Sequence, residues 1–81
     1  MEIESKLRNF ILENYLFTDD QTALDNNDSF LDKGIIDSTG ILELIFFLEE
    51  ELKIKVEDDE MVPENLDSVN NILGYLSKKI K

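Results

Sequence analysis

The sequence contains no cysteine and no histidine among its 81 residues, and it has one proline and three glycines. Disulfides and thiolate metal sites are therefore excluded, and the commonest general base and metal ligand is absent with histidine. A chain of this length forms a single small domain, residues 1–81, whose core has no cross-link to stabilise it. We expect neither a catalytic residue nor a metal site, so the chain is not expected to be an enzyme.

Basic residues are also scarce, because eight Lys and Arg stand against nineteen Asp and Glu and give a formal net charge of -11. Such a chain repels nucleic-acid phosphates and anionic membranes, so neither is an expected partner. The apolar run from Ile41 to Leu48 is interrupted by Glu43 and is far shorter than the about 20 residues that span a bilayer. The charged N-terminal segment has no signal-peptide core. We therefore expect a cytoplasmic monomer that meets basic protein surfaces.

Apolar residues recur at helical spacing in three segments, which predicts an all-α fold. The first helix is expected from residue 3 to residue 16 or 17, the second from residue 37 or 38 to residue 52 or 53, and the last from residue 67 or 68 onward. The acidic stretch 57–62 is expected to form one short helical segment that Pro63 ends. The predicted architecture is a small bundle of three main helices plus one short helix, with a long loop between the first two.

The second helix has more apolar residues than one buried face needs. The residues expected on its core face are Ile41, Leu44, Ile45, Leu48 and Leu52. Leu42 and Phe46 fall outside that stripe, and with Ser38 they are spaced four apart along one ridge. The glutamates that flank this ridge are Glu43, Glu49, Glu50 and Glu51. The pattern leaves open whether Phe46 faces a partner or folds into the core.

Asp37 and Ser38 stand where a turn leads into the second helix. Asp37 is a good N-cap residue, and Ser38 places a hydroxyl where unpaired N–H groups and the positive end of the helix dipole favour a phosphate. The pairs Asp28-Ser29 and Asp67-Ser68 are explained as turn and cap residues. The same explanation is available for Asp37-Ser38, so the residues alone leave two interpretations of Ser38: a simple cap, or the bearer of a phosphate-linked group.

The order of these features resembles the acyl carrier protein family over essentially the whole chain. The segments that carry the resemblance are Phe30-Leu31, Gly34-Ile35-Ile36-Asp37-Ser38, Glu43-Leu44 and Leu48-Glu49-Glu50-Glu51-Leu52. The resemblance implies that Ser38, next to the motif residue Asp37, is the attachment point of 4'-phosphopantetheine. A phosphopantetheinyl transferase, also called carrier protein synthase, transfers this group from coenzyme A with the help of a divalent cation.

The resemblance also implies that the second helix is the one that partner enzymes recognise. The partner-binding positions that it assigns are Thr39, Leu42, Glu43, Phe46, Glu49 and Glu50. The chain would hold an acyl or aminoacyl group as a thioester on the arm. It would present this group to acyl- or aminoacyl-activating and acyl-transferring enzymes with basic docking surfaces, in fatty acid, polyketide or related biosynthesis.

Thr39 and Gly40 depart from the family pattern, in which many carriers follow the serine with Leu. A Gly at this place resembles free-standing carriers that serve amino-acid-activating enzymes, such as D-alanyl carrier proteins, so the cargo class stays open. In the first turn of a helix, Gly40 is expected to cost up to about 1 kcal/mol relative to Ala.

Two other functional classes compete with the carrier. An acidic helical adaptor without a prosthetic group accounts equally well for the charge and for the ridge of Leu42 and Phe46, but it does not account for Ser38. A calcium-binding helix pair is suggested by the acidic residues in the loop after the first helix. That loop lacks the central Gly and terminal Glu of the twelve-residue calcium loop, so we do not expect it to bind calcium.

Overall fold

A computed structural model describes residues 2–79 of the chain, and these residues are helical or irregular, with no strand among them. The elements in chain order are α1 (Glu2–Ile11), the π-helical turn η1 (Leu12–Leu16), the 3-10 turn η2 (Gln21–Ala23), α2 (Ser38–Leu52), the 3-10 turn η3 (Asp58–Glu60), α3 (Pro63–Leu66) and α4 (Val69–Lys79). The predicted all-α bundle, with three main helices, a short one and a long first loop, is confirmed.

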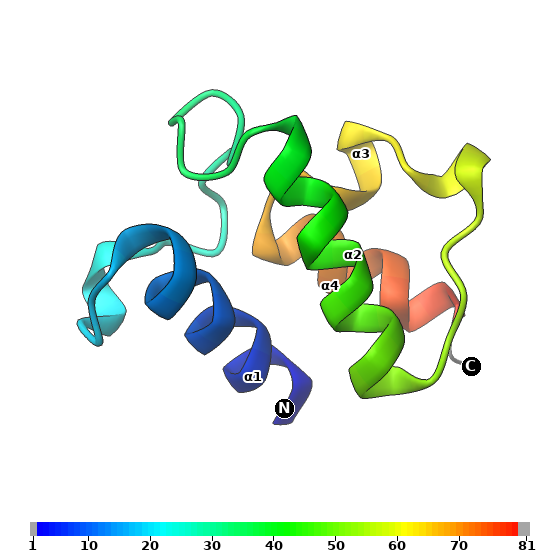
Figure 1. Cartoon of the computed structure of the whole chain (residues 1–81), viewed down its shortest axis with the longest axis horizontal. Helices are drawn as coiled ribbons and strands as arrows, with labels where there is room; N and C mark the ends of the chain where they lie inside the picture. The colour runs from blue at the N-terminus through cyan, green and yellow to red at the C-terminus, as the bar shows by residue number, and fades with distance from the viewer. Residues whose placement is uncertain (1, 80–81) are drawn as a thin grey trace.

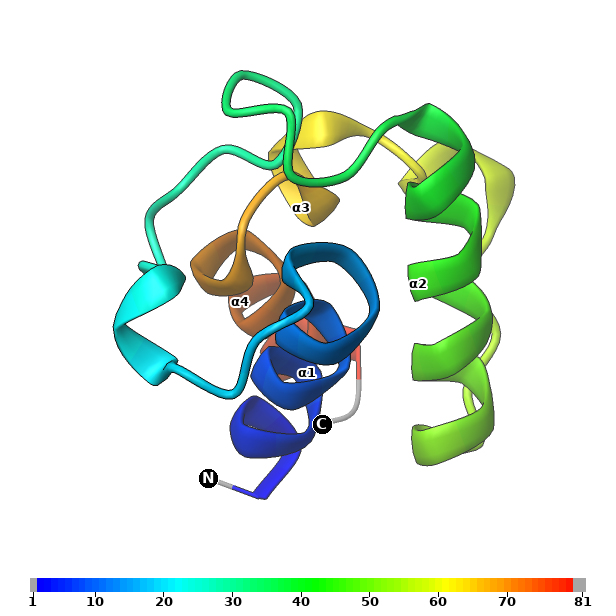
Figure 2. The ribbon, with the colours of Figure 1, turned by 60° about the vertical axis from the view of Figure 1, so that its left-hand side comes forward.

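The helices form two groups. α4 packs against both α1 and α3, while the backbone of α2 comes close to the other helices at few places. α2 accordingly stands apart from the α1–α4 pair in Figure 2, whereas in the view of Figure 1 it crosses in front of α4. Large side chains therefore bridge most of the space between α2 and the rest of the protein. None of the described helices is both long enough and apolar enough to cross a membrane.

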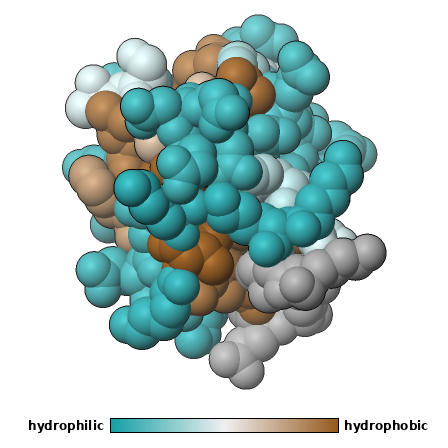
Figure 3. Space-filling view, turned by 90° about the vertical axis from the view of Figure 1, so that its right-hand side faces the viewer, coloured by the Kyte–Doolittle hydropathy of each residue, from teal (hydrophilic) through white to brown (hydrophobic). Residues whose placement is uncertain are grey.

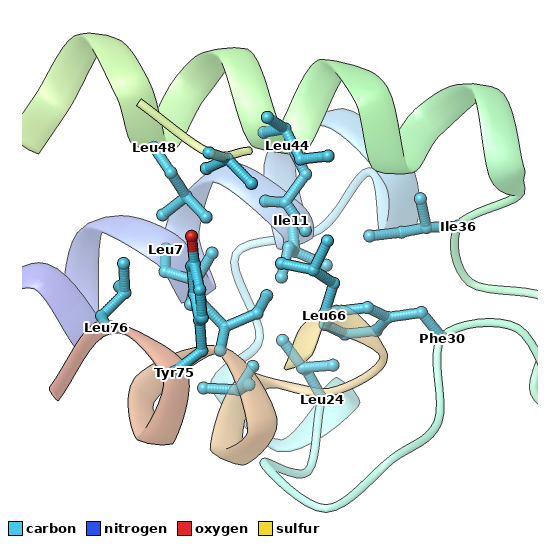
Figure 4. Packing of buried hydrophobic residues seen from close by; sticks show 14 of the residues in the cluster. Leu7, Ile11, Leu24, Phe30, Ile36, Leu44, Leu48, Leu66, Tyr75 and Leu76 are labelled. Carbon is cyan, nitrogen blue, oxygen red and sulfur yellow. The ribbon is translucent and has the colours of Figure 1, made fainter. Parts of the chain in front are cut away.

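The core fills the space between α1, α2 and α4. Leu44 and Leu48 of α2 point toward Leu7 and Ile11 of α1 (Figure 4). The long loop contributes Phe30, which is fully buried at the end of the core near α3. Burial of such side chains, at about 25 cal/mol per Å² of apolar surface, is the main stabilising contribution in a chain without disulfides.

The expected core face of α2 is only partly confirmed. Leu44, Ile45 and Leu48 are buried, whereas Ile41 and Leu52 are half-buried. Ile41 borders a surface groove and Leu52 is the last residue of the helix. Both residues therefore keep contact with solvent on one side.

The first helix reaches residue 16, as expected, but its last turn is a π-helix. Phe17 ends this turn in the left-handed region (φ 54°), where its N–H donates to the carbonyl of Leu12. The side chain of Phe17 is 83% exposed. A single wide turn of this kind adds one residue without changing the apolar pattern noticeably, so the periodicity of the sequence does not indicate it.

The prediction that Pro63 ends a helical segment was wrong. Pro63 begins α3 instead of ending a helix, and the acidic stretch before it forms only the short turn η3. Val62 is extended (φ -122°, ψ 153°), as a residue before proline prefers to be. Proline suits the first position of a helix, because its fixed φ is already helical and the N–H that it lacks would have no helical acceptor there.

Polar side chains fasten the long loop at both ends. Arg8 of α1 donates from Nη2 to the carbonyl oxygens of Gln21 (2.7 Å) and Leu24 (2.8 Å). At the other end, Oδ1 of Asp67 accepts the backbone N–H of Leu31 (3.0 Å), and the carbonyl of Asp67 accepts that of Phe30 (2.8 Å). Asp67 is therefore occupied with the loop, and the cap of α4 is Ser68, the other predicted candidate, whose hydroxyl accepts from the N–H of Asn71.

Gly40 permits the close approach of η1 to the first turn of α2. A Cβ atom at this position would lie 2.6 Å from Cγ2 of Ile36 and 3.1 Å from Cε1 of Tyr15. Ile36 is buried and β-branched, so its methyl group has little freedom to move away. The helix propensity that Gly40 costs is therefore outweighed by the clash that a Cβ atom at this position would cause.

We predict that Gly40→Ala lowers the free energy of unfolding by about 1–2 kcal/mol, because overpacking costs about 1–3 kcal/mol and the gain in helix propensity is at most about 1 kcal/mol. Gly74→Ala in α4 is the matched control, since nothing lies within 4 Å of its Cβ position. It should stabilise the protein by about 0.5–1 kcal/mol. Urea unfolding followed by circular dichroism measures both, and stabilisation by Gly40→Ala would contradict the close contact.

Glu60 links η3 to α4. Its Oε1 accepts hydrogen bonds from Lys79 Nζ (2.6 Å), Tyr75 Oη (2.9 Å) and the backbone N–H of Glu57 (2.9 Å). The Lys79 ammonium and the Glu57 N–H favour the carboxylate and lower the pKa of Glu60 from 4.5 to about 2. The charged form of Glu60 therefore stabilises the folded state.

We predict that Glu60→Gln is less stable than the wild type at pH 7 and that the difference narrows at low pH. Because the pKa of Glu60 is lower in the folded chain, its contribution is complete above pH 4.5 and is lost as the pH falls toward 2. Asp59→Asn, which removes a neighbouring exposed carboxylate, is the control. Urea midpoints measured between pH 7 and pH 2 test the prediction, which fails if the difference stays constant over that interval.

Candidate functional site

Asp37 and Ser38 form a well-defined start of α2. Asp37 is extended (φ -88°, ψ -178°), and its Oδ1 accepts the N–H of Gly40 at 2.7 Å, while its carbonyl accepts that of Ile41 at 3.0 Å. The N–H groups of Ser38 and Thr39 have no acceptor among the described residues. The predicted cap at Asp37 is confirmed, and two free N–H donors remain at the positive end of the helix dipole.

The three serines that follow an aspartate differ in what their hydroxyl groups do. Ser29 donates its hydroxyl to Asp67, and Ser68 is buried and caps α4. Ser38 is exposed, and its hydroxyl has no hydrogen-bond partner within residues 2–79. Ser38 is therefore the one serine of the three whose hydroxyl is both accessible and unused.

An apolar groove opens between α2 and the segment around α3. Its volume is about 220 Å³, and we call it the α3 groove. The residues that line it are Leu31, Ser38, Ile41, Leu42, Ile45, Met61, Val62, Pro63, Leu66 and Asp67. Ser38 lies at its edge, so a group attached to that hydroxyl has an apolar surface next to it.

A second groove lies on the other side of α2, toward α1. Its volume is about 480 Å³, and we call it the α1 groove. It is lined by Phe10, Asn14, Tyr15, Glu43, Phe46, Phe47 and Glu50. The predicted ridge of Ser38, Leu42 and Phe46 is thus divided, because its first two members line the α3 groove and Phe46 lines the α1 groove.

Most of the predicted partner-binding residues are accessible. Thr39, Glu43 and Glu50 are exposed, as are Leu42 (51%) and Phe46 (64%). The open question about Phe46 is thereby settled, because the side chain faces solvent and does not enter the core.

Glu49 differs from the other five predicted contacts. It is half-buried, and its Oε2 accepts the N–H of Val56 at 2.9 Å, which holds the chain after α2. A substitution of Glu49 would therefore affect this connection as well as any partner.

On the face that carries the connection between α2 and α3, hydrophilic side chains predominate and hydrophobic ones gather in small patches (Figure 3).

Tyr15 is a site residue that the sequence did not indicate. Its hydroxyl donates to Oε1 of Glu43 (2.5 Å) and to the carbonyl of Gly40 (3.3 Å). Burial raises the pKa of Tyr15 to about 12, assisted by the hydrogen bond to Glu43 and by the charges of Glu43 and Asp37. The phenol is therefore protonated at neutral pH and positions the Glu43 carboxylate. Because 28 residues separate Tyr15 from Glu43, no local spacing rule relates them.

Carrier proteins are found among the proteins whose sequences are similar to this chain, although no family model matches it. An acyl carrier protein of Buchnera aphidicola subsp. Schizaphis graminum is 36% identical over 99% of this chain and 87% of the relative. A D-alanyl carrier protein of Streptococcus suis is 34% identical over 91% of this chain and 90% of the relative.

A solved structure supports the fold. The solution structure of a holo acyl carrier protein from Nitrosomonas europaea superposes with a TM-score of 0.77, at 20% identity, over 99% of this chain and 98% of that one. The relatives include carriers named for acyl and for D-alanyl groups, and they match nearly the whole length of this sequence. On this similarity of sequence and fold, the chain belongs to the acyl carrier protein family and has a carrier-protein role.

Proposed function

We propose that this chain carries an acyl group as a thioester on a 4'-phosphopantetheine arm attached to Ser38. The observation that carries the proposal is the exposed and unpaired hydroxyl of Ser38 at the first residue of α2, beside an apolar groove. The residues fit the group. The free N–H donors of Ser38 and Thr39 suit the phosphate, and Asp37 is already engaged by the N–H of Gly40. The arm supplies the thiol that forms the thioester.

The proposed attachment requires an external enzyme. The sequence has no histidine, and within the described residues no side chain hydrogen-bonds to the Ser38 hydroxyl to activate it. A phosphopantetheinyl transferase would therefore bring the base, the divalent cation and coenzyme A. The chain itself contributes an accessible nucleophile in a fixed position, which is a carrier's role and not an enzyme's.

The exposed face of α2 is the proposed docking surface for this transferase and for the enzymes that load and unload the arm. The accessible residues of this surface are Thr39, Leu42, Glu43, Phe46 and Glu50. Glu49 also belongs to the proposed surface, although its side chain holds the N–H of Val56. With a net charge of -11, the chain attracts basic surfaces over a distance set by the ionic strength. An acidic adaptor would use the same face, but the adaptor hypothesis does not account for the exposed and unpaired hydroxyl of Ser38.

We predict that coenzyme A, magnesium and a broad-range phosphopantetheinyl transferase add one phosphopantetheine to the wild-type chain. Ser38→Ala should remain unmodified and keep its helical circular dichroism, because the Ser38 hydroxyl makes no structural contact. Ser29→Ala is the matched control and should still be modified. Intact-protein mass spectrometry measures both, and modification of Ser38→Ala would disprove the assignment.

The α3 groove favours an apolar acyl chain over an amino acid as cargo. Eight of the ten residues that line it are apolar, the two others being Ser38 and Asp67. A hydrocarbon chain that enters the groove leaves water, which contributes about 0.8 kcal/mol for each buried methylene. A D-alanyl group has a charged ammonium and gains nothing from such a surface.

We predict that the octanoyl-loaded chain melts at a higher temperature than the chain with a free thiol, and that the D-alanyl-loaded chain does not. A single variant, Val62→Asp, places a carboxylate in the groove and should reduce the octanoyl effect. Melting of the octanoyl-loaded, D-alanyl-loaded and free-thiol forms, followed by circular dichroism, provides the comparison. Equal melting temperatures for the octanoyl and D-alanyl forms would exclude the α3 groove as an acyl site.

A further inference from the structure

Asp67 brings a carboxylate to the otherwise apolar α3 groove. It lies between α3 and α4, and it is half-buried. Among the described residues that line the groove, Ser38 and Asp67 alone have a side-chain oxygen or nitrogen atom. The hydroxyl of Ser38 would be used up as an ester oxygen once an arm is attached. A group that enters the groove of the loaded chain therefore finds one side-chain acceptor for a strong hydrogen bond, the carboxylate of Asp67.

The Asp67 carboxylate is fixed by the long loop but is not saturated by it. Oδ1 accepts the N–H of Leu31 (3.0 Å), and Oδ2 accepts the hydroxyl of Ser29. Each oxygen of a carboxylate can accept two hydrogen bonds, and here each accepts one from the loop. Within residues 2–79, no lysine or arginine forms an ion pair with Asp67. The carboxylate thus has a defined orientation and further capacity to accept hydrogen bonds.

The 4'-phosphopantetheine arm contains donors that need such an acceptor. A hydroxyl group and amide N–H groups lie between its phosphate and its thiol. An acyl chain that enters the α3 groove draws the adjoining part of the arm toward the same walls. A buried N–H group that loses its hydrogen bonds to water is costly unless another acceptor replaces water. Because Asp67 borders the groove together with Ser38, its carboxylate can supply that acceptor.

We propose that Asp67 accepts a hydrogen bond from an amide N–H of the arm when an acyl chain occupies the α3 groove. The inference rests on the proposed function, in which Ser38 bears the arm. A carboxylate accepts a stronger hydrogen bond than a neutral oxygen does. The bonds to Leu31 and Ser29 already order the side chain, so that little conformational entropy is lost when the arm binds. Asp67 then holds the arm along the groove and directs the acyl chain between the apolar walls.

The experiment observes the arm itself. A phosphopantetheinyl transferase loads the unlabelled chain from ¹⁵N-labelled octanoyl-coenzyme A, and NMR follows the exchange of the arm's amide protons with solvent. In the wild type, one arm amide should exchange about ten-fold more slowly than in free octanoyl-pantetheine, because a hydrogen bond to a charged group must open first. A nuclear Overhauser effect from this amide proton to Hβ of Asp67 should identify the acceptor.

A pair of matched variants tests the carboxylate. Asp67→Asn removes the charge but keeps an oxygen for the N–H of Leu31, and it should abolish most of the slowing of the arm amide. Asp32→Asn is the control, because it removes an exposed carboxylate of the same loop that does not line the groove. It should leave the slow amide unchanged. Equal exchange rates in the two variants would overturn the proposal.

Ser29→Ala separates arm binding from anchoring of the loop. It removes one of the bonds between the loop and Asp67 but leaves both carboxylate oxygens as acceptors. The slow arm amide should therefore persist in Ser29→Ala. If Asp67 served only to anchor the loop, Ser29→Ala and Asp67→Asn would change the exchange of the arm in the same way, and this result would also overturn the proposal.

Failure of the proposed function would be visible separately. A chain that accepts no phosphopantetheine, as measured by its mass, would overturn the proposed function and this inference together. A loaded wild-type chain whose arm amides all exchange as fast as those of free octanoyl-pantetheine would overturn the inference about Asp67 alone.

Discussion

The close approach of η1 to the first turn of α2 is the constraint on which the rest of the site depends. Gly40 has no Cβ, and this allows Ile36 to pack beneath the turn and Tyr15 to pack beside it. The Asp37 cap fixes the direction in which the helix starts. With the turn held from three sides, Ser38 is presented to solvent at a defined place although it makes no contact of its own.

Away from this point α2 stands apart from the other helices. Its backbone approaches them at few places, and large side chains such as Phe10 and Phe47 fill the space between. This spacing leaves a groove on each side of the helix. One groove is apolar and begins at Ser38, and the other is aromatic and acidic. The same separation that limits the contacts of α2 therefore provides its two grooves.

Much of this arrangement could be predicted from the sequence. The extents of the main helices, the cap at Asp37 and the candidate Ser38 follow from local periodicity and from side chains that act within one turn. The exposure of Leu42 was also predictable, because it falls outside the apolar stripe. These features depend on residues that are neighbours in the chain.

The remaining features depend on contacts between residues far apart in the sequence. The hydrogen bond from Tyr15 to Glu43 and the anchoring of the long loop by Arg8 join separate elements. Gly40 was interpreted as a weak point of the helix because its neighbours in space, Ile36 and Tyr15, were not known. Pro63 was interpreted as the end of a helix, but a proline is found both after the end of a helix and at its first position. Only the course of the chain after Pro63 distinguishes these two places, and here the chain continues as α3.

The placement of the two grooves also bears on how a carrier delivers its cargo. In the proposed arrangement, an acyl chain lies in the α3 groove on one side of α2, and the α1 groove on the other side stays open to a docking partner. Because the helix separates the two surfaces, a partner can bind the chain before the acyl group leaves its groove. Docking and release of the cargo are then separate steps, and the partner's affinity for the loaded carrier does not depend on displacing the cargo. The carrier remains attractive to its partners while the thioester is still sheltered from water.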